Sequence, residues 1–276
     1  MTINCRGTLL DLSSPVVMGI LNITPDSFYE GSRMKTEDQV RAQVEKMLEE
    51  GAQIIDIGGV SSRPGADFVS VDEELSRVVP IINLLTKCYP EALLSIDTYR
   101  AKVAKESIDA GIHLMNDISA SSIDEGLLDV VAAGKVPYVL MHMKGTPQDM
   151  QQQASYDSVV VEVMDFFLKK IALLKSKGIQ DIIIDPGFGF GKTIEHNYQL
   201  LNHLSVYKAL EMPILAGISR KSMIWKVLKN TPQEALQGTT ALHVIALQNG
   251  ANLLRVHDVR PAVEAIQLMQ VLADNK

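Results

Sequence analysis

The stretch DIIIDPGFG (181–189) decides the fold class, because a short apolar run ends on an acidic residue and leads into a glycine-rich loop. Three consecutive isoleucines put apolar side chains on both faces of the predicted strand, as in a parallel sheet that is covered on both sides. The same pattern recurs at 16–23, 52–59, 93–98, 112–119, 136–143, 213–219 and 252–258. Such a series predicts an α/β fold in which a parallel sheet is built from strand–helix units.

Helical patterns separate these strands, most clearly at 35–51, 70–85, 156–178 and 231–250. Eight strand–helix units in about 250 residues have the size of a (β/α)8 TIM barrel. No linker-like Gly/Ser- or Pro-rich stretch interrupts the chain, so we expect a single domain over 1–276. Within it, 16–273 form the barrel, and 1–15 form a short N-terminal extension, expected as a small hairpin across the barrel bottom.

Local signals predict where several helices begin. The segments 36–39 and 70–73 have the Thr/Ser-x-x-Gln/Glu spacing of a capping box. Thr231 precedes Pro232, and proline is common at the first helical position, so a helix is expected to begin there. Pro80 falls inside the second helical pattern and is expected to kink that helix or to split it in two.

Composition and charge exclude several classes of protein. The chain has 276 residues, a net charge of −7 and a pI of about 5.4, which argues against non-specific nucleic-acid binding. No apolar run approaches the ~20 residues of a membrane span, and the start of the chain does not resemble a secretory signal. Cys5 and Cys88 lie far apart and without a metal-like spacing, so they are predicted to be free thiols in a reducing, cytoplasmic compartment.

Polar residues gather at the carboxyl ends of the predicted strands, whereas the strand beginnings are apolar or neutral. In a TIM barrel the active site is built at that end by the strand ends and the loops that follow them. The residues concerned are Asn22, Asp56, Asp97, Asn116, Asp117, His142, Asp185, Ser219, Arg220, Lys221, Arg255 and His257. We therefore expect one functional site at this face.

The acceptors in this ring suit a flat heterocycle. Asp97, Asn116 and Asp185 offer carboxylates and an amide, which match an amidine-like edge that presents donors and acceptors side by side. Such an edge is a small-molecule feature, so the site is expected to take small substrates.

The donors in the ring suit an anion. Lys221, Arg255 and His257 can bind carbonyl or phosphate oxygen. Arg255 and His257 occupy alternate positions of one strand, so their side chains point the same way. Asn22 is a single oxygen ligand, which is enough for Mg²⁺ when phosphate oxygens complete its coordination.

Two long loops follow the first and second strands. TPDSFYEGSR (24–33) and SSRPGADFVS (61–70) both contain Pro, Gly, Ser, Phe and Arg. Loops of this length at the catalytic face are typically lids or substrate clamps.

Eight motifs together resemble the dihydropteroate synthase family. MGILNITPDSFYEGS (18–32) and GAQIIDIGGVSSRPG (51–65) are similar to the two signature motifs of that family. The shorter motifs follow in the same order: SIDTYR (95–100), NDIS (116–119), MHMKGTPQDMQ (141–151), DPGFGFGK (185–192), GISRKS (217–222) and RVHDV (255–259). The resemblance covers nearly the whole chain. It implies an enzyme that condenses 6-hydroxymethyl-7,8-dihydropterin diphosphate with 4-aminobenzoate to give 7,8-dihydropteroate and diphosphate, with Mg²⁺ as cofactor and sulfonamides as inhibitors.

The resemblance also implies roles for individual residues. Catalytic roles fall to Asp97, Lys221, Arg255 and His257. The pterin would be held by Asp97, Asn116, Asp185, Lys221 and Arg255. The diphosphate would be held by Asn22, Arg63, Arg255 and His257, with Asn22 as the metal ligand. The aminobenzoate side would comprise Phe28, Ser61, Ser62, Arg63, Pro64, Phe188, Gly189, Phe190, Lys221 and Ser222.

The chain departs from the family pattern in its first two loops. Val60 stands where the family usually has Glu, so we expect that Glu to have a structural rather than a chemical role. Ser62 replaces a frequent Thr but keeps the hydroxyl, and Glu30 stands where Asp is common.

Other functions remain open from the residues alone. A corrinoid-dependent methyltransferase would share the pterin grip, but it needs no diphosphate site, and Arg63, Arg255 and His257 argue against it. Gly191-Lys192-Thr193 resembles the end of a phosphate-binding P-loop, although Pro186 stands where that loop needs its first Gly. Lys221 could form an imine in an aldolase, but its place in GISRKS favours substrate binding.

One helix carries a prediction about assembly. The 231–250 pattern is apolar around much of its circumference, including Leu242 and Ile245. An outer barrel helix needs only one apolar stripe. We therefore expect a homodimer that uses this helix, consistent with the family, and we expect His243 to take part in packing or in that interface.

Overall fold

The computed structural model describes residues 1–23, 33–61 and 68–275, and for 33–36 it describes the backbone alone. All eight expected barrel strands form, and they run parallel in the order β8-β7-β6-β5-β4-β3-β10-β9. Their bounds are β3 Val16–Asn22, β4 Ile54–Gly58, β5 Leu93–Asp97, β6 Leu114–Asp117, β7 Tyr138–Met141, β8 Ile182–Asp185, β9 Leu215–Ala216 and β10 Leu253–Val256. A bridge between Ile184 and Ile214 joins the two edges, so the sheet is a nearly closed barrel. The predicted TIM barrel is confirmed.

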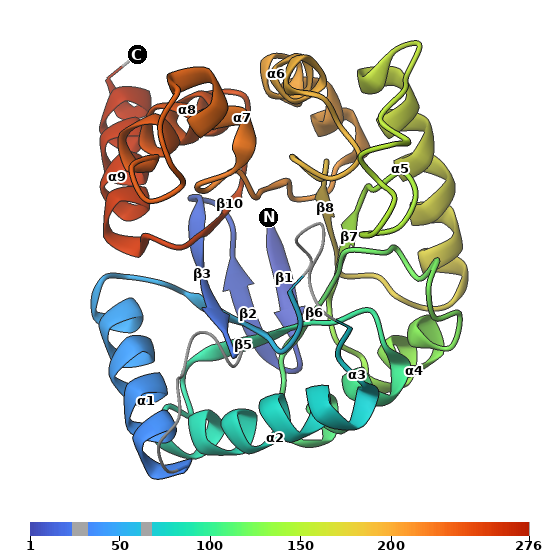
Figure 1. The fold of residues 1–276 in the computed structure, drawn as a ribbon, viewed down its shortest axis with the longest axis vertical. Helices are drawn as coiled ribbons and strands as arrows, with labels where there is room; N and C mark the ends of the chain where they lie inside the picture. Colours follow the sequence, from blue (N-terminus) through green and yellow to red (C-terminus); the bar gives the residue numbers. More distant parts are fainter. Residues whose placement is uncertain (24–32, 62–67, 276) are drawn as a thin grey trace.

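Helices surround the barrel as an outer ring, as Figure 1 shows. They are α1 Arg33–Glu49, α2 Val71–Cys88, α3 Ala101–Asp109, α4 Leu127–Gly134, α5 Val159–Ser176, α6 Ile194–Asn202, a 3₁₀ helix at Leu204–Leu210, α7 Ser222–Leu228, α8 Leu236–Gln248 and α9 Val259–Asp274. The main core lies between ring and barrel, where outward-facing strand residues such as Ile55 and Leu94 meet helix residues such as Val78 and Ile82. Among the described residues, no helix is both long and apolar enough to cross a membrane.

The helix signals in the sequence are partly correct. Ser70 caps α2 by accepting a hydrogen bond from the Glu73 amide, as its capping-box spacing predicts. The box predicted at 36–39 is wrong, because α1 begins at Arg33 and these residues lie within the helix rather than at its start. Of the two outcomes expected at Pro80, a kink or a split, the split does not occur, since α2 continues through that residue to Cys88.

The last predicted helix begins later than expected. Thr231 and Glu234 do pair, with the Glu234 carboxylate accepting from the Thr231 amide at 3.0 Å and from its hydroxyl at 2.9 Å. This pair closes a turn, and α8 starts only at Leu236. The capping signal is therefore real, but the chain does not continue directly into the helix.

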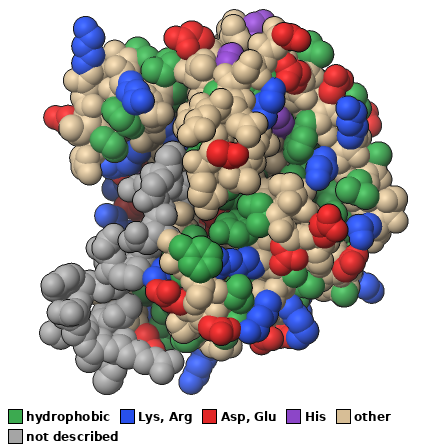
Figure 2. Space-filling view, turned by 45° about the vertical axis from the view of Figure 1, so that its right-hand side comes forward, with side chains coloured by type: hydrophobic (Ala, Val, Ile, Leu, Met, Phe, Trp, Pro, Cys, Tyr) green, Lys and Arg blue, Asp and Glu red, His purple; other side chains and the backbone are tan. Residues whose placement is uncertain are grey.

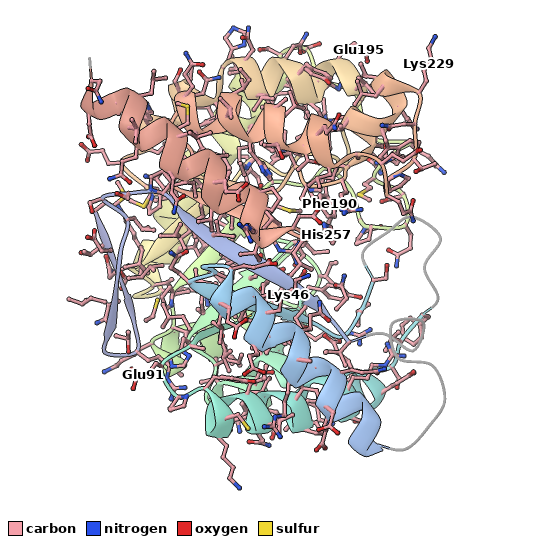
Figure 3. The ribbon with its side chains drawn as sticks, turned by 90° about the vertical axis from the view of Figure 1, so that its left-hand side faces the viewer. Lys46, Glu91, Phe190, Glu195, Lys229 and His257 are labelled. Carbon is pink, nitrogen blue, oxygen red and sulfur yellow. The ribbon has the colours of Figure 1, made fainter. Side chains whose placement is uncertain are left out.

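A hairpin closes the amino-terminal end of the barrel. β1 Thr2–Cys5 pairs with β2 Thr8–Asp11, antiparallel, across a turn in which Arg6 and Gly7 both have positive φ. Its apolar face packs on the first inward-facing residues of the barrel strands, which form a separate cluster with Ile3, Cys5, Leu10 and Leu12. In Figure 3 the hairpin lies at one end of the barrel, away from the labelled Phe190 and His257. We propose that the hairpin and barrel form a single domain.

Candidate active site

The interior of the barrel is layered, because side chains two residues apart on a strand point to the same face. The layer over the hairpin is apolar and includes Ile54, Leu114, Ile183 and Leu253. Two residues further along the same strands stand Asp56, Asn116, Asp185 and Arg255. The change from apolar to polar along each strand therefore places charged groups inside the barrel, near the carboxyl ends of the strands.

Arg255 links three strands at the centre of this polar layer. Its Nε donates to Asp56 Oδ2 at 2.6 Å, and its Nη2 donates to Asp97 Oδ2 at 2.6 Å. Asn116 Nδ2 donates to the same Asp56 oxygen at 3.0 Å. Four residues that are far apart in the sequence thus form one hydrogen-bonded cluster, including three of the predicted pterin-binding residues.

Asp56 belongs to this cluster, although sequence reasoning noted only its strand-end position and assigned it no role. Its side chain is fully buried, and within the described part of the chain its Oδ1 has no hydrogen-bond partner. Its register neighbour on β5, Ser95, also has a buried oxygen without a partner there. A carboxylate inside an otherwise apolar strand was the signal, and the open acceptors fit a polar ligand.

A row of register neighbours crosses the upper rim of the barrel. Asn22 pairs with Gly58, Gly58 with Asp97, and Asp97 with Asn116. A Cβ at Gly58 would lie 3.6 Å from Asn22 Oδ1 and 4.0 Å from Asp97 Oδ2. Glycine therefore leaves space between these two oxygen-bearing side chains.

Burial shifts the titration of the site toward neutral pH. It raises the pKa of Asp97 to about 7, although Arg255 acts in the opposite direction. It also raises the pKa of Asp185, against the nearby Lys221, and lowers the pKa of Lys221 to about 8. Perturbed carboxylates and amines of this kind cluster at functional sites.

The ends of β9 and β10 are tied together. Ser219 Oγ lies 3.1 Å from His257 Nδ1, and Arg220 binds Asp258 with two hydrogen bonds of 2.7 and 2.8 Å. Lys221 directly follows Arg220, and His257 directly precedes Asp258. The contacts therefore bring Lys221 and His257 to the same side of the barrel mouth. Figure 3 shows His257 and Phe190 toward the same end of the molecule.

The loop after β8 forms another wall. Asp185 accepts a hydrogen bond from the Gly187 amide at 2.7 Å, and Lys221 Nζ donates to the Phe188 carbonyl. That amine also lies 4.6 Å from the centre of the half-buried Phe190 ring. The Phe188 ring is fully buried in the outer core, so Phe188 faces Lys221 through its backbone carbonyl, and Phe190 is the partly exposed ring of this loop.

The P-loop alternative fails on the contacts of Lys192. Its amine points inward and donates to the carbonyls of Gly187 and Phe190 at 3.0 and 2.9 Å, rather than being free for a phosphate. Thr193 caps α6 by accepting a hydrogen bond from the His196 amide, so this segment begins a helix. Lys192, however, is a buried contact of the loop and not simply part of that start.

Other predicted residues lie at the rim or beyond the described residues. Gly189 is partly buried within the loop after β8, Ser61 is exposed after β4, and Ser222 begins α7. Val60, at the family's Glu position, is partly exposed. The following residues lie outside the described ranges: Phe28, Glu30, Ser62, Arg63 and Pro64.

The described residues offer no ready-made metal cluster, because none of them form a group of three His, Cys, Asp or Glu side chains suited to a metal ion. On the face in Figure 2, acidic and basic side chains that the view describes are intermixed rather than segregated. The charge that matters for a small anionic substrate is therefore local to the barrel mouth.

Comparisons with known proteins agree with this geometry. A family model described as "Pterin binding enzyme" matches residues 18–257. The dihydropteroate synthase of Escherichia coli (strain K12) is 43% identical over 278 residues, which cover 100% of this chain and 98% of that protein.

Solved structures give the same result. The Yersinia pestis dihydropteroate synthase in a sulfonamide drug complex matches with a TM-score of 0.93 and 45% identity, covering 99% of this chain and 100% of that one. The Xanthomonas albilineans dihydropteroate synthase in complex with 7,8-dihydropteroate matches with a TM-score of 0.89 and 40% identity, covering 99% of each chain. These likenesses extend over the barrel, the hairpin and the polar mouth.

Proposed function

Since the chain belongs to the dihydropteroate synthase family of pterin binding enzymes, we propose how the residues at its barrel mouth divide the work of the reaction. The enzyme is a transferase that joins 6-hydroxymethyl-7,8-dihydropterin diphosphate to 4-aminobenzoate and releases diphosphate. The buried cluster of Asp56, Asp97, Asn116 and Arg255 is the single observation that carries the proposal, because it presents pterin-binding groups around one point of the barrel interior.

The pterin ring is bound by the polar side chains inside the barrel, near the carboxyl ends of the strands. Asp97 and Asp185 accept hydrogen bonds from its amidine-like edge, and Asn116 can both accept and donate there. Lys221 donates to the carbonyl oxygen of the ring. Arg255 leaves its present contact with Asp97 and lies over the ring. The hydrogen bonds that now join Arg255 to Asp56 and Asp97, and Asn116 to Asp56, support this, since a ligand can take the place of such internal partners.

The diphosphate lies above the ring, toward the rim. Arg255, His257 and Asn22 bind it, together with Arg63 on the resemblance of its motif. Asn22 fits an Mg²⁺ ion that takes most of its other ligands from phosphate oxygens and water, because its side chain is exposed at the rim and carries an uncharged oxygen ligand. When bound, that ion neutralises charge on the departing diphosphate.

No residue of the protein needs to act as a nucleophile. As the diphosphate departs, positive charge develops at the pterin methylene, and the carboxylates of Asp97 and Asp56 stabilise it from below. The amine of 4-aminobenzoate then attacks the same carbon. Because water would compete for it, the protein contributes mainly by orientation and by exclusion of solvent.

The aminobenzoate side is formed by the loop after β8 and by the start of α7. Phe190, Gly189, Lys221 and Ser222 are its described members, and Ser61 stands at its edge. Phe28, Ser62, Arg63 and Pro64 complete it on the resemblance of the two loop motifs. A sulfonamide would occupy the same place.

Binding of the pterin diphosphate in the absence of aminobenzoate tests the pterin grip. Asp185→Asn should raise the dissociation constant about tenfold or more, because a charge-assisted hydrogen bond to the pterin is lost. Asp181→Asn is the matched control, because it makes the same change just before the other end of β8, where Asp181 accepts from Asn4 of the hairpin. Equal affinity of the Asp185 variant and the wild type would overturn the assignment.

The homodimer is proposed on the surface of α6, α7 and α8. Ile245 and Leu242 of α8 line a groove of about 520 Å³ together with Tyr198 and Leu201 of α6. Val227 and Leu228 of α7 are about half exposed.

Two unpaired cysteines support a cytoplasmic location.

A further inference from the structure

Lys192 is a buried lysine whose amine is surrounded by acceptors. Its side chain is nearly inaccessible, at 3% exposure. Its Nζ contacts His142 Nδ1 at 3.0 Å and three backbone carbonyls, those of Phe190 at 2.9 Å, Gly187 at 3.0 Å and His142 at 3.2 Å. Burial lowers the pKa of this amine to about 7, and in its protonated form it has three protons to donate, which these contacts exhaust. Burying an amine without a hydrogen-bonded carboxylate costs free energy, so the position is one where another benefit is to be expected.

The contacts of this amine join two loops. His142 follows β7, and Gly187 and Phe190 follow β8, so the amine holds the two segments together. Gly187 has φ +71°, and a Cβ there would lie 1.9 Å from the His142 carbonyl oxygen. Gly191 has φ +59°, and its Cβ would lie 2.8 Å from the carbonyl of Lys144. Glycine permits this close approach of the two loops. Lys192 then joins them by donating hydrogen bonds to carbonyls of both.

The same loop faces the active site on its other side. Lys221 Nζ donates to the Phe188 carbonyl and lies against the Phe190 ring. The Gly189 amide donates to Asn197 Oδ1 at 2.6 Å. Two lysines therefore hold 187–190 from opposite sides, one from the core and one from the pocket. When Lys221 exchanges the Phe188 carbonyl for a substrate, the core-side contacts of Lys192 remain, together with those of Gln151, Tyr156 and Asn197, to hold the loop.

The protonation of the pair suits this role. Burial lowers the pKa of His142 to about 2, so its ring is neutral and Nδ1 can accept from the amine. The His142 ring is itself held edge-on against Phe166, with centroids 4.8 Å apart. His142 is thus a fixed acceptor rather than a titrating group of the site.

We propose that Lys192 is a positioning residue of the active site, whose buried amine fixes the loop 187–191 and thereby the placement of Phe190 and Lys221 toward 4-aminobenzoate. The functional half rests on the aminobenzoate side proposed above. The inference gives the Gly-Lys-Thr segment a purpose that is unrelated to phosphate binding. It also gives a role to His142, a strand-end residue that the reaction itself does not use.

Lys192→Met tests the inference, because it keeps the length of the side chain and removes the amine. Protein labelled with 4-fluorophenylalanine reports the loop by ¹⁹F NMR without any substrate, with the Phe188 and Phe190 signals assigned by substitution. We expect the Phe190 resonance to move and the KM for 4-aminobenzoate to rise about tenfold or more, on the scale that a small misplacement produces. The KM for the pterin diphosphate should rise by less than the KM for 4-aminobenzoate, since Asp97 and Asn116 do not contact the loop and only Asp185 and Lys221 of the pterin-binding residues do.

Lys170→Met is the matched control. Lys170 is a partly buried lysine of α5 that donates to the Ala120 carbonyl at 2.7 Å, away from the loop. It should lose some stability but keep the Phe190 resonance and both KM values. If Lys192→Met does not fold, His142→Asn carries the test, since it weakens one of the four contacts and should move the same resonance by less and raise the same KM.

A folded Lys192→Met protein with an unchanged Phe190 resonance and unchanged KM values would overturn the inference. A moved resonance with an unchanged aminobenzoate KM would overturn its functional half and the place of Phe190 in the pocket. Wild-type protein without aminobenzoate-dependent turnover would instead contradict the proposed function, while the resonance would still decide whether Lys192 fixes the loop.

Discussion

At the scale of single residues, the free site is a set of charges that satisfy one another. Arg255 is shared between Asp56 and Asp97, and Asn116 completes the cluster. Such groups are costly to bury alone and are preorganised when paired. We propose that the substrate is bound by exchange of these internal partners for its own donors and acceptors.

Arg255→Lys tests the importance of that sharing. Lysine keeps the charge but cannot reach both carboxylates with a planar fork, so one of them is left with a weaker partner. We expect kcat/KM for the pterin diphosphate to fall roughly 100-fold, which corresponds to about 3 kcal/mol. Steady-state kinetics would measure it, with Arg260→Lys on the exposed surface of α9 as the control. A loss of less than about threefold would contradict the role of Arg255.

The pH dependence follows from two shifted groups. Asp97, with its pKa raised to about 7, is ionised above that pH and can accept from the pterin. Lys221, with its pKa lowered to about 8, is charged below that pH and can donate to oxygen. We expect kcat/KM for the pterin diphosphate to fall below about pH 7 as Asp97 gains a proton and above about pH 8 as Lys221 loses one.

A pH–rate profile measures both limbs. Asp97→Asn should remove the acid limb, at the cost of a lower plateau, because the amide no longer titrates. A profile that stays flat between about pH 6 and about pH 9 would contradict the assignment of these two residues.

The residue scale also shows what the sequence could and could not predict. The sequence predicts that polar residues at the ends of apolar strands lie at the barrel mouth, because this pattern can be recognised without a structure. These residues are Asp97, Asn116, Asp185, Lys221 and Arg255. Asp56 was given no role, since its importance lies in contacts with residues from other strands. The sequence could not show that the Phe188 ring is buried while the Phe190 ring is partly exposed, because the directions of these two rings depend on the backbone angles of the loop.

At the scale of elements, strands were predictable and helix ends were less so. The strand pattern depends on burial on both faces, which leaves continuous apolar runs such as 182–184. The start of α8 was misplaced because the Thr231–Glu234 pair stabilises a turn as well as it stabilises a helix start. Pro80 did not split α2, since packing of Val78, Ile81 and Ile82 in the core offsets the cost of the missing hydrogen bond.

The hairpin gives a stability prediction at this scale. Leu10 packs on the barrel bottom, whereas its neighbour Leu9 is 68% exposed. Leu10→Ala should lower the free energy of unfolding by about 3 kcal/mol through lost contacts and a cavity, and Leu9→Ala should change it by less than about 0.5 kcal/mol. Chemical denaturation would measure both. Equal effects of the two substitutions would mean that the hairpin does not close the barrel as described.

At the scale of the whole molecule, the chain places its hydrophobic closure at one end and its chemistry at the other. The hairpin fills the barrel bottom (Figure 3), and the polar residues of the strands lie toward their carboxyl ends. A TIM barrel has this polarity because stability and catalysis are assigned to opposite faces. The sequence predicts this polarity well, since the residues of each strand change from apolar at its beginning to polar at its end.

The proposed dimer is tested by a charge on α8. Ile245 is 39% exposed beside the groove between α6 and α8, so Ile245→Glu would bury an unpaired carboxylate in the interface. We expect sedimentation to shift from dimer to monomer at about micromolar concentration. Val161→Glu is the control, because Val161 is 57% exposed on α5 and should leave the dimer intact. A wild-type protein that sediments as a monomer would contradict the proposal.

The central claim is the reaction itself, and diphosphate release tests it most directly. Purified protein is mixed with 6-hydroxymethyl-7,8-dihydropterin diphosphate and Mg²⁺, with and without 4-aminobenzoate, and diphosphate and 7,8-dihydropteroate are quantified together. The account predicts that release requires 4-aminobenzoate and that the two products appear in equal amounts. Release that is absent, or that is the same with and without 4-aminobenzoate, would contradict it.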